Sequence, residues 1–228
     1  MKDGKRRRNR KNRKKTDKKA DEITDKTADE ITDKRLIILD VNGLLCKKLL
    51  KTDSECDKIL KYYGSHETLE LERFFVFIRP HVREFITKCY SYGTVGFWSS
   101  TKRVNAEPIL KHILTKSQYE KSLFRWYRDK TKSDPETSEF ATVKIIQDLF
   151  DSEGHPKCYG FNNTVICDDE SSKLRHNPEN NSIVFRSFDP CDNTKEDDNT
   201  KEGSKGPSDS KWVDDLYGMI IKKFENLN

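Results

Sequence analysis

Residues 35–41 read RLIILDV, an aliphatic run between charged segments that is best explained as a strand buried on both faces of a sheet. Further short apolar runs follow along the chain. Between them lie segments with the i, i+3, i+4 spacing of amphipathic helices. Strands that alternate with helices favour a mostly parallel central sheet covered by helices on both sides. The sequence therefore predicts an α/β fold.

The predicted elements account for most of the chain after residue 34. The predicted strands cover residues 35–41, 71–78, 94–98, 163–167 and 182–188, with a short strand candidate at 123–127. The strand at 163–167 is counted as the fourth strand of the core sheet. The predicted helices cover residues 102–114, 139–151 and 211–226, and another begins at Pro80 with Val82, Phe85, Ile86, Cys89 and Tyr90 on one face.

Two segments are too polar to contribute to a core. Residues 1–34 and 189–210 contain six apolar residues between them, although 33% of the whole chain is hydrophobic. The first segment contains the near-identical octads DKKADEIT and DKTADEIT, and the second contains the hexads DNTKED and DNTKEG. We expect a disordered tail at 1–34, and a folded domain at 35–228 that carries a mobile low-complexity loop at 189–210.

The basic character of the chain belongs to its first residues. Residues 1–19 carry a net charge of +10 and residues 20–34 carry −4, so little of the total of +5 lies in the predicted domain. The run KRRRNRKNRKK at 5–15 is typical of a nuclear-import signal, of an RNA contact or of a tail that raises solubility. A nuclear location is the first expectation, and a mitochondrial or cytoplasmic location is the alternative.

The cysteines and the apolar runs indicate the class of protein. The six cysteines form no CxxC pair and no secretory signal is visible, which favours free thiols in a reducing compartment over a zinc site. The longest apolar runs are far shorter than the roughly 20 residues of a membrane-spanning helix. We therefore expect no membrane span.

Acidic residues stand where two of the predicted strands end. Asp40 closes the first aliphatic run, and Asp168 and Asp169 follow the strand at 163–167. A carboxylate at the end of a buried strand costs desolvation free energy unless a cation or hydrogen-bond donors offset it. Ligands of parallel sheets bind at the carboxyl ends of the strands, so we expect these side chains to share a hard cation, with Mg²⁺ as the first candidate.

Each of these positions also has a purely structural explanation. An Asp after a strand is often a turn or helix-capping residue, and Asn42-Gly43 is a common tight-turn pair. Two acidic strand ends in one βα pattern favour a metal site over two unrelated turns. With the hydroxyl-bearing turn at 99–101 and a lysine, they would fit phosphoryl transfer through an aspartyl-phosphate.

The order of motifs resembles a known family. LIILDVNGLL, FIRPHVREFITKCY, VGFWSST and NTVICDDESSKLRHNPEN are similar to segments of the haloacid-dehalogenase (HAD) superfamily. More narrowly they resemble its FCP/SCP-like (NLI-interacting-factor-like) domain, which acts on the C-terminal domain of RNA polymerase II. The resemblance covers about residues 35–190 and the last helix. It implies a three-layer, Rossmann-like fold with a small β insertion.

The resemblance also implies roles for individual residues. They are Asp40 as the nucleophile, Asn42 at the position of the general acid/base, Ser99 (or Ser100, if the alignment slips by one) as donor to the phosphoryl oxygens, Lys144 as the neutralising lysine, and Asp168 and Asp169 as the acidic pair. The implied Mg²⁺ ligands are the side chains of Asp40, Asp168 and Asp169 and the main-chain carbonyl of Asn42. In the predicted helix at 139–151, Lys144 could equally be an ordinary solvent-exposed lysine.

Two tryptophans lie close to these motifs. Trp98, directly before Ser99, is expected to fill the core or to wall the site. Trp126 falls where the family carries its β insertion beside the substrate groove, and it could contact a peptide or simply pack.

The chain departs from the family pattern at Asn42, where the family has Asp. An amide neither gives nor takes the proton that the leaving alkoxide and the attacking water need. Loss of general acid–base help typically costs about 10²–10⁴ in rate. The enzyme is therefore expected to be slow, to use another acid such as Glu170, or to be an inactive protein that binds phosphate.

The leading hypothesis is a Mg²⁺-dependent phosphatase of phosphoserine or phosphothreonine in an extended peptide. The alternative is an inactive scaffold on the same fold, either a phosphopeptide-binding protein or a protein of mitochondrial import like the Tim-class translocase subunit. The basic tail adds RNA or an import receptor as candidate partners.

Overall fold

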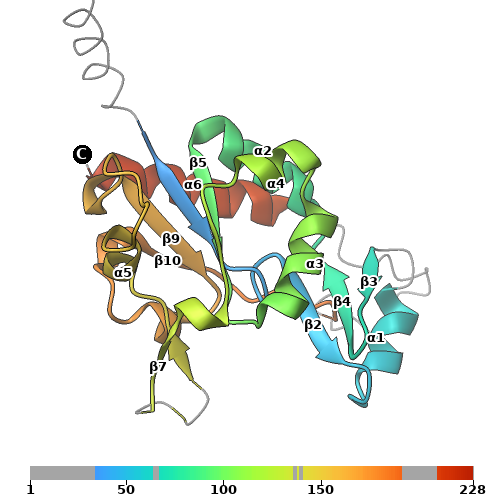
Figure 1. Ribbon diagram of the computed structural model, residues 1–228. Coiled ribbons are helices and arrows are strands. Elements are labelled where there is room, and N and C mark those ends of the chain that lie inside the picture. Colours follow the sequence, from blue (N-terminus) through green and yellow to red (C-terminus); the bar gives the residue numbers. More distant parts are fainter. Residues whose placement is uncertain (1–33, 64–66, 136–137, 139–140, 192–209, 228) are drawn as a thin grey trace, which may run out of the picture. The chain divides into compact units, whose positions relative to one another are not determined.

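The computed structural model describes residues 34–63, 67–135, 138, 141–191 and 210–227. Its central sheet has five strands in the order β10-β9-β1-β5-β6, and every neighbouring pair is parallel (Figure 1). The strands are β1 (Leu36–Leu39), β5 (Thr94–Trp98), β6 (Arg125–Trp126), β9 (Thr164–Asp168) and β10 (Ser182–Val184). The prediction of a mostly parallel α/β sheet is confirmed.

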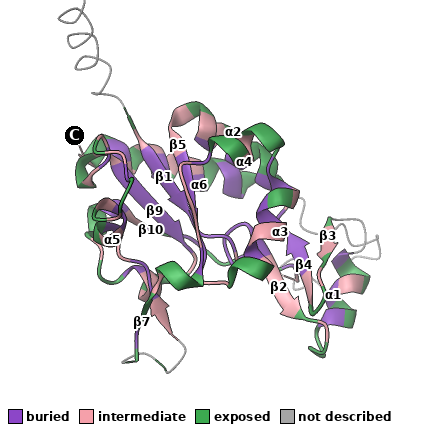
Figure 2. Ribbon diagram, in the orientation of Figure 1, coloured by how far each residue is buried: buried purple, intermediate pink, exposed green. Residues whose placement is uncertain are grey.

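Strand β1 is buried on both faces, as its unbroken aliphatic sequence predicts. The helices are α1 (Cys56–Tyr63), α2 (Val82–Tyr92), α3 (Arg103–Ile113), α4 (Lys116–Lys121), α5 (Ile146–Phe150) and α6 (Lys211–Leu227). Ile37 and Leu39 pack in one core cluster with α2, α3 and α6, and Leu36 and Ile38 pack in a second cluster with α5. Helices thus cover both faces of the sheet, whose strands are largely buried (Figure 2).

A second, antiparallel sheet follows β1 in the chain. Its strands are β2 (Cys46–Leu50), β3 (Thr68–Glu70) and β4 (Phe74–Ile78), in the order β2-β4-β3. The predicted strand at 71–78 therefore exists over its second half, but its placement in the core sheet was wrong. Its Phe77 packs against Tyr63 of α1 with ring centroids 5.4 Å apart. The run is rich in apolar residues because both of its faces are covered: Val76 and Ile78 pack in the main core cluster, and Phe77 packs in a separate small cluster with α1.

The predicted helix at 139–151 is only partly present. Thr142–Val143 form β8, which pairs with β7 (Lys132–Ser133), and the helix α5 begins only at Ile146. The prediction failed because the side chain of Asn177, a distant residue, bonds the main chain here instead. It donates to the carbonyl of Lys144 and accepts from the amide of Ile146, so the helix does not extend further toward residue 139. Short 3₁₀ helices complete the fold at Arg128–Lys130, Phe161–Asn163, Ser171–Leu174 and Glu179–Asn181.

The buried side chain of Arg79 connects the loop after β1 with the last helix. Arg79 Nη1 donates a hydrogen bond to the carbonyl of Leu44 at 2.9 Å, and its guanidinium lies 4.2 Å from the centroid of the Trp212 ring. Trp212 in turn donates from Nε1 to the carbonyl of Pro80 at 2.9 Å. Although α6 ends the chain, it therefore helps to fix the loop that carries Asn42.

Some predictions fall on residues outside the described ranges. The tail at 1–33 and most of the predicted loop, residues 192–209, are among them. Among the described residues, Cys46, Cys56, Cys89, Cys158 and Cys167 are free thiols. Within the described ranges, no helix combines the length and the apolar character that a membrane crossing requires.

Candidate active site

Three carboxylates meet at the carboxyl-terminal edge of the central sheet. Asp40 follows β1, Asp168 ends β9, and Asp169 comes next in the chain. One ligand oxygen from each lies within 4.8 Å of the others. The two strands are in parallel register, with Leu39 beside Cys167, and the amide of Asp40 donates to the carbonyl of Cys167 at 2.9 Å. The predicted convergence of these three residues is confirmed.

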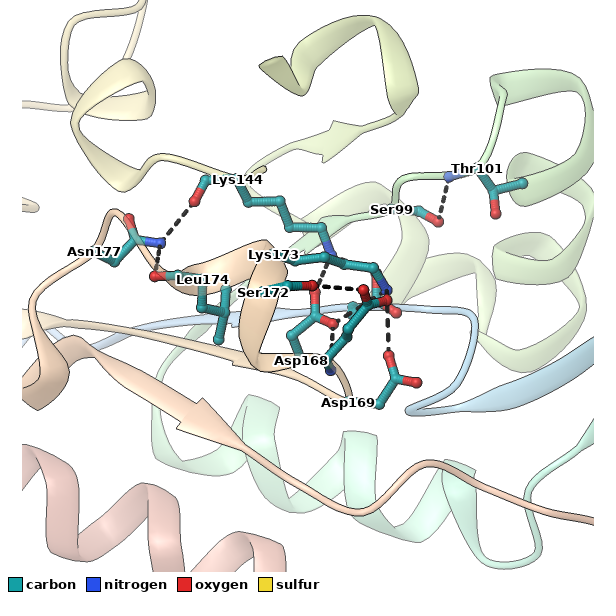
Figure 3. Close-up of polar contacts among 11 residues, drawn as sticks. Ser99, Thr101, Lys144, Asp168, Asp169, Ser172, Lys173, Leu174 and Asn177 are labelled. Carbon is teal, nitrogen blue, oxygen red and sulfur yellow. Dashed lines mark hydrogen bonds and ion pairs between the residues drawn. The ribbon is translucent and has the colours of Figure 1, made fainter. Parts of the chain in front are cut away.

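Lys144 lies at the centre of this cluster. Its side chain is fully buried, and its ammonium group donates to Asp40 Oδ1 and, at 2.6 Å, to Asp168 Oδ2 (Figure 3). The residue lies in the short connection between β8 and α5, outside the helix that the sequence predicted. The alternative of a solvent-exposed lysine is therefore wrong.

Asn177 holds the main chain of Lys144 in place. Its Nδ2 donates to the carbonyl of Lys144 at 2.7 Å and to that of Leu174 at 3.1 Å, and its Oδ1 accepts from the amide of Ile146 at 2.7 Å. The side chain thus links the lysine segment to the turn that follows the acidic pair (Figure 3). Asn177 lies in the motif NTVICDDESSKLRHNPEN, but no role for it was predicted from the sequence.

Lys173 is a second lysine at the same site, and it was not predicted from the sequence. Its Nζ lies 3.4 Å from Asp168 Oδ1, 3.5 Å from Asp169 Oδ1 and 3.1 Å from Glu170 Oε2. The only available signal was its spacing of three residues from Glu170 and four from Asp169. On a helical turn, those spacings bring side chains to one face.

The electrostatic environment shifts the pKa values of the three carboxyl groups in different directions. Burial raises the pKa of Asp40 to about 7, although Lys144 opposes the shift. Burial also raises the pKa of Asp169, again against the effect of Lys173. For Asp168 the desolvation is outweighed by the two lysines, and its pKa is lowered. These values describe the protein without a metal ion, in which the two lysines are the cations next to the carboxylates.

Asn42 belongs to a tight turn after β1. Its Oδ1 accepts a hydrogen bond from the amide of Lys48 at 2.9 Å. The next residue, Gly43, has φ +100, a conformation that favours glycine, and a Cβ there would lie 2.0 Å from Asp169 Oδ2. The turn thus brings the main chain directly against the carboxylate of Asp169, which no larger residue at position 43 would allow.

The hydroxyl-bearing turn follows β5, the neighbour of β1. Ser99 is almost fully buried, its amide donates to the carbonyl of Trp126 at 2.9 Å, and its Oγ accepts from the amide of Thr101 at 3.2 Å (Figure 3). Ser100 Oγ is buried and has no hydrogen-bond partner within the described part of the chain. Both hydroxyls remain candidates for the phosphoryl donor.

The residues of this site lie within a segment that matches a known protein family. The family described as NLI interacting factor-like phosphatase matches residues 35–203. The chain belongs to this family. Curated proteins similar to this chain include an FCP1 homology domain-containing protein of Schizosaccharomyces pombe, 26% identical over 66% of this chain, and a CTD phosphatase-like protein of Invertebrate iridescent virus 3, 28% identical over 37%. The chain spans 60% and 46% of the lengths of these two proteins.

Solved structures support the fold. Fission yeast RNA polymerase II CTD phosphatase Fcp1 in a beryllium fluoride-bound form matches with a TM-score of 0.53 at 12% identity, over 85% of this chain and 51% of Fcp1. A second structure of the CTD phosphatase Fcp1 matches with a TM-score of 0.52, also at 12% identity, over 85% of this chain and 49% of that one. The HAD-like fold implied by the sequence is therefore confirmed.

The acidic cluster of this NLI interacting factor-like domain fits a hard divalent cation. Asp40 Oδ2 is buried and has no hydrogen-bond partner within the described residues, so it is available as a ligand. Three carboxylates offer the oxygen donors that Mg²⁺ prefers. Asp40, Asp168 and Asp169 would hold the ion, and the carbonyl of Asn42 is the fourth ligand that the family resemblance implies.

Glu170 is poorly suited to replace the missing acid. Its Oε1 accepts a hydrogen bond from Ser172 Oγ at 2.6 Å, and its Oε2 lies near Lys173. The bond from Ser172 and the charge of Lys173 lower its pKa despite partial burial. A carboxyl that is ionised at neutral pH has no proton to donate, so the structure argues against Glu170 as the general acid.

The two tryptophans pack against each other. Trp98 is fully buried, and its ring centroid lies 4.9 Å from that of Trp126 with the planes at 86°. Trp126 belongs to β6 at the edge of the central sheet, so its predicted placement in the β insertion was wrong; the hairpin β7-β8 begins further along. Packing accounts for Trp98, which leaves the half-buried Trp126 as the aromatic residue nearer to solvent.

Proposed function

We propose that this chain is a Mg²⁺-dependent phosphoprotein phosphatase that acts on phosphoserine or phosphothreonine in an extended peptide. The observation that carries the proposal is the convergence of three carboxylates and the buried ammonium of Lys144 at one edge of the sheet. Family membership supports the reaction class. The similarity to Fcp1, a phosphatase of the RNA polymerase II CTD, supports a polypeptide substrate.

The proposed reaction has two steps. In the first, an oxygen of Asp40 forms a bond to phosphorus, the bond from phosphorus to the serine or threonine oxygen breaks, and that oxygen leaves with a proton taken from water. In the second, water attacks the aspartyl-phosphate, which releases inorganic phosphate and regenerates Asp40.

Lys144 and Ser99 have supporting roles in this scheme. The ammonium of Lys144 offsets the negative charge that accumulates when a phosphoryl group approaches the carboxylates. The Ser99 hydroxyl, or that of Ser100, donates to a phosphoryl oxygen. A bound Mg²⁺ would supply further charge neutralisation at the same oxygens.

The test of this proposal is hydrolysis of p-nitrophenyl phosphate by the full chain with Mg²⁺ and with a chelator. We expect slow turnover that requires Mg²⁺, and then turnover of a phosphoserine peptide. If neither substrate is hydrolysed with Mg²⁺ present, the phosphatase proposal fails. Binding of the phosphopeptide without hydrolysis would favour the second candidate, an inactive phosphopeptide-binding protein, which the amide at position 42 supports.

Asn42→Asp is expected to raise turnover by at least about 10²-fold, because it restores a group that can transfer the proton. The carboxylate would still accept the hydrogen bond from the Lys48 amide that Asn42 accepts now, so the turn should survive. The measurement is kcat with the aryl phosphate. Asn162→Asp is the matched control, since Asn162 is exposed just before the opposite end of β9. An unchanged kcat in Asn42→Asp would mean that proton transfer at this position does not limit the rate.

The location of the protein is also a proposal. The basic run at 5–15 supports a nuclear location, in agreement with a substrate like the RNA polymerase II CTD. RNA or an import receptor are the partners proposed for the same run.

A further inference from the structure

Lys173 contacts the carboxylate oxygens on the side of the cluster that Lys144 does not use. Lys144 bonds Asp168 through Oδ2, whereas Lys173 lies 3.4 Å from Oδ1 of the same residue and 3.5 Å from Asp169 Oδ1. The Lys173 side chain is 16% exposed, so water screens these contacts only in part. Both carboxyl groups of the acidic pair therefore already have an ammonium partner.

A divalent cation would need these same two carboxylates. An ammonium group that contacts them repels a second cation and takes part of their capacity as ligands. Lys144 alone already offsets one negative charge of the cluster. Lys173 thus adds a positive charge at the place where positive charge lowers the affinity for a metal ion.

We infer that Lys173 is a tethered competitor of the divalent cation, which weakens metal binding and sets the Mg²⁺ concentration at which the site is filled. This inference rests on the metal site of the proposed function. It does not require that the bound metal support catalysis.

Glu170 is an alternative partner for the Lys173 ammonium group when a metal ion binds the acidic pair. Glu170 Oε2 lies 3.1 Å from Lys173 Nζ, and the Glu170 side chain is 55% exposed. The main chain of Lys173 is fixed, because its amide donates to the Glu170 carbonyl at 3.2 Å and its carbonyl accepts from the Lys144 amide at 2.9 Å. The ammonium group can therefore keep its contact with Glu170 when a metal ion takes the acidic pair, while the turn stays in place.

The experiment is isothermal titration calorimetry of Mg²⁺ into the full chain and its variants. Lys173→Met is expected to bind Mg²⁺ at least about 10-fold more tightly than wild type, whereas Lys173→Arg keeps the charge and should stay within about 2-fold of wild type. Lys88→Met is the matched control: Lys88 pairs with Asp214 and Glu84 on helices away from the acidic cluster, and its removal should leave the Mg²⁺ affinity unchanged. A second readout is the rise in Tm on adding Mg²⁺, which should be larger in Lys173→Met than in wild type.

The possible results separate this inference from the proposed function. Equal or weaker Mg²⁺ binding by Lys173→Met overturns the inference, even if the wild-type chain hydrolyses phosphate esters. Tighter binding by Lys173→Met without any hydrolysis supports the inference and counts against the phosphatase. If neither the wild type nor Lys173→Met shows a heat of binding or a rise in Tm with Mg²⁺, the metal site and the inference both fail.

Discussion

Asp40→Asn should lower the hydrolysis of an aryl phosphate by at least about 10³-fold, since an amide oxygen cannot take the place of the attacking carboxylate. The replacement is nearly isosteric and can still accept a hydrogen bond from Lys144, so the fold should persist. The change in the free energy of unfolding should be small. Burial raises the pKa of Asp40 to about 7, so part of the wild-type protein already carries a neutral group at this position at pH 7. The measurements are kcat and the circular dichroism spectrum of the variant.

A matched control and a second readout test the role of Asp40. Asp148→Asn removes a carboxylate that pairs with Lys132 at the surface, and it should leave kcat unchanged. Beryllium fluoride with Mg²⁺ should raise the Tm of the wild-type chain by mimicking the phosphorylated Asp40, and this rise should be lost in Asp40→Asn. Activity retained in Asp40→Asn would assign the nucleophile to another residue.

Lys144→Met should have the largest effect on stability. The change leaves two buried carboxylates, Asp40 and Asp168, without the cation that now bonds both. Breaking a buried ion pair by removal of one partner costs about 3–5 kcal/mol in the free energy of unfolding. Urea unfolding without metal measures this cost, and added Mg²⁺ should recover part of it. We also expect kcat to fall by about 10²–10³ through loss of charge stabilisation.

The stability loss of Lys144→Met should depend on pH. Without the lysine, the pKa values of the buried carboxyls in the folded protein would lie above their ordinary value of 3.8. Such groups bind protons more tightly in the folded than in the unfolded chain, so the folded stability of the variant is fullest below about pH 4 and falls as the pH rises. The fall extends beyond pH 7, because the pKa of Asp40 is already about 7 in the wild type, where Lys144 lowers it. Lys132→Met, which removes an exposed partner of Asp148, should change stability by less than about 1 kcal/mol at any of these pH values. Equal stability of wild type and Lys144→Met at pH 7 would contradict the structural role given to Lys144.

Much of the fold could be predicted because the signals were local. The aliphatic run before Asp40 and the strand at 94–98 need only their own residues to be recognised, and burial on both faces follows from their composition. Parallel pairing then brings Asp40 and Asp168 to one edge, since ligands of such sheets gather there. That is why the acidic cluster could be expected from two short motifs far apart in the sequence.

The errors have one physical cause, which is contact with residues distant in the chain. The segment at 142–145 carries a helical pattern, but pairing with β7 and bonds to Asn177 override it. The strand at 74–78 is apolar because α1 covers one of its faces and the main core covers the other, which its own sequence does not show. Lys173 is one basic residue in a polar turn, and only the folded turn reveals that it faces three carboxylates.

The bonds of Asn177 make the two halves of the site inseparable. The side-chain amide of Asn177 donates to the carbonyls of Lys144 and Leu174 and accepts from the main-chain amide of Ile146. The carbonyl of Lys173 accepts a hydrogen bond from the main-chain amide of Lys144. The lysine segment cannot open without releasing the turn behind the acidic pair. Hydrogen exchange in both segments would then report a single cooperative opening event, in which the charge-neutralising lysine and the cation-binding carboxylates are gained or lost together.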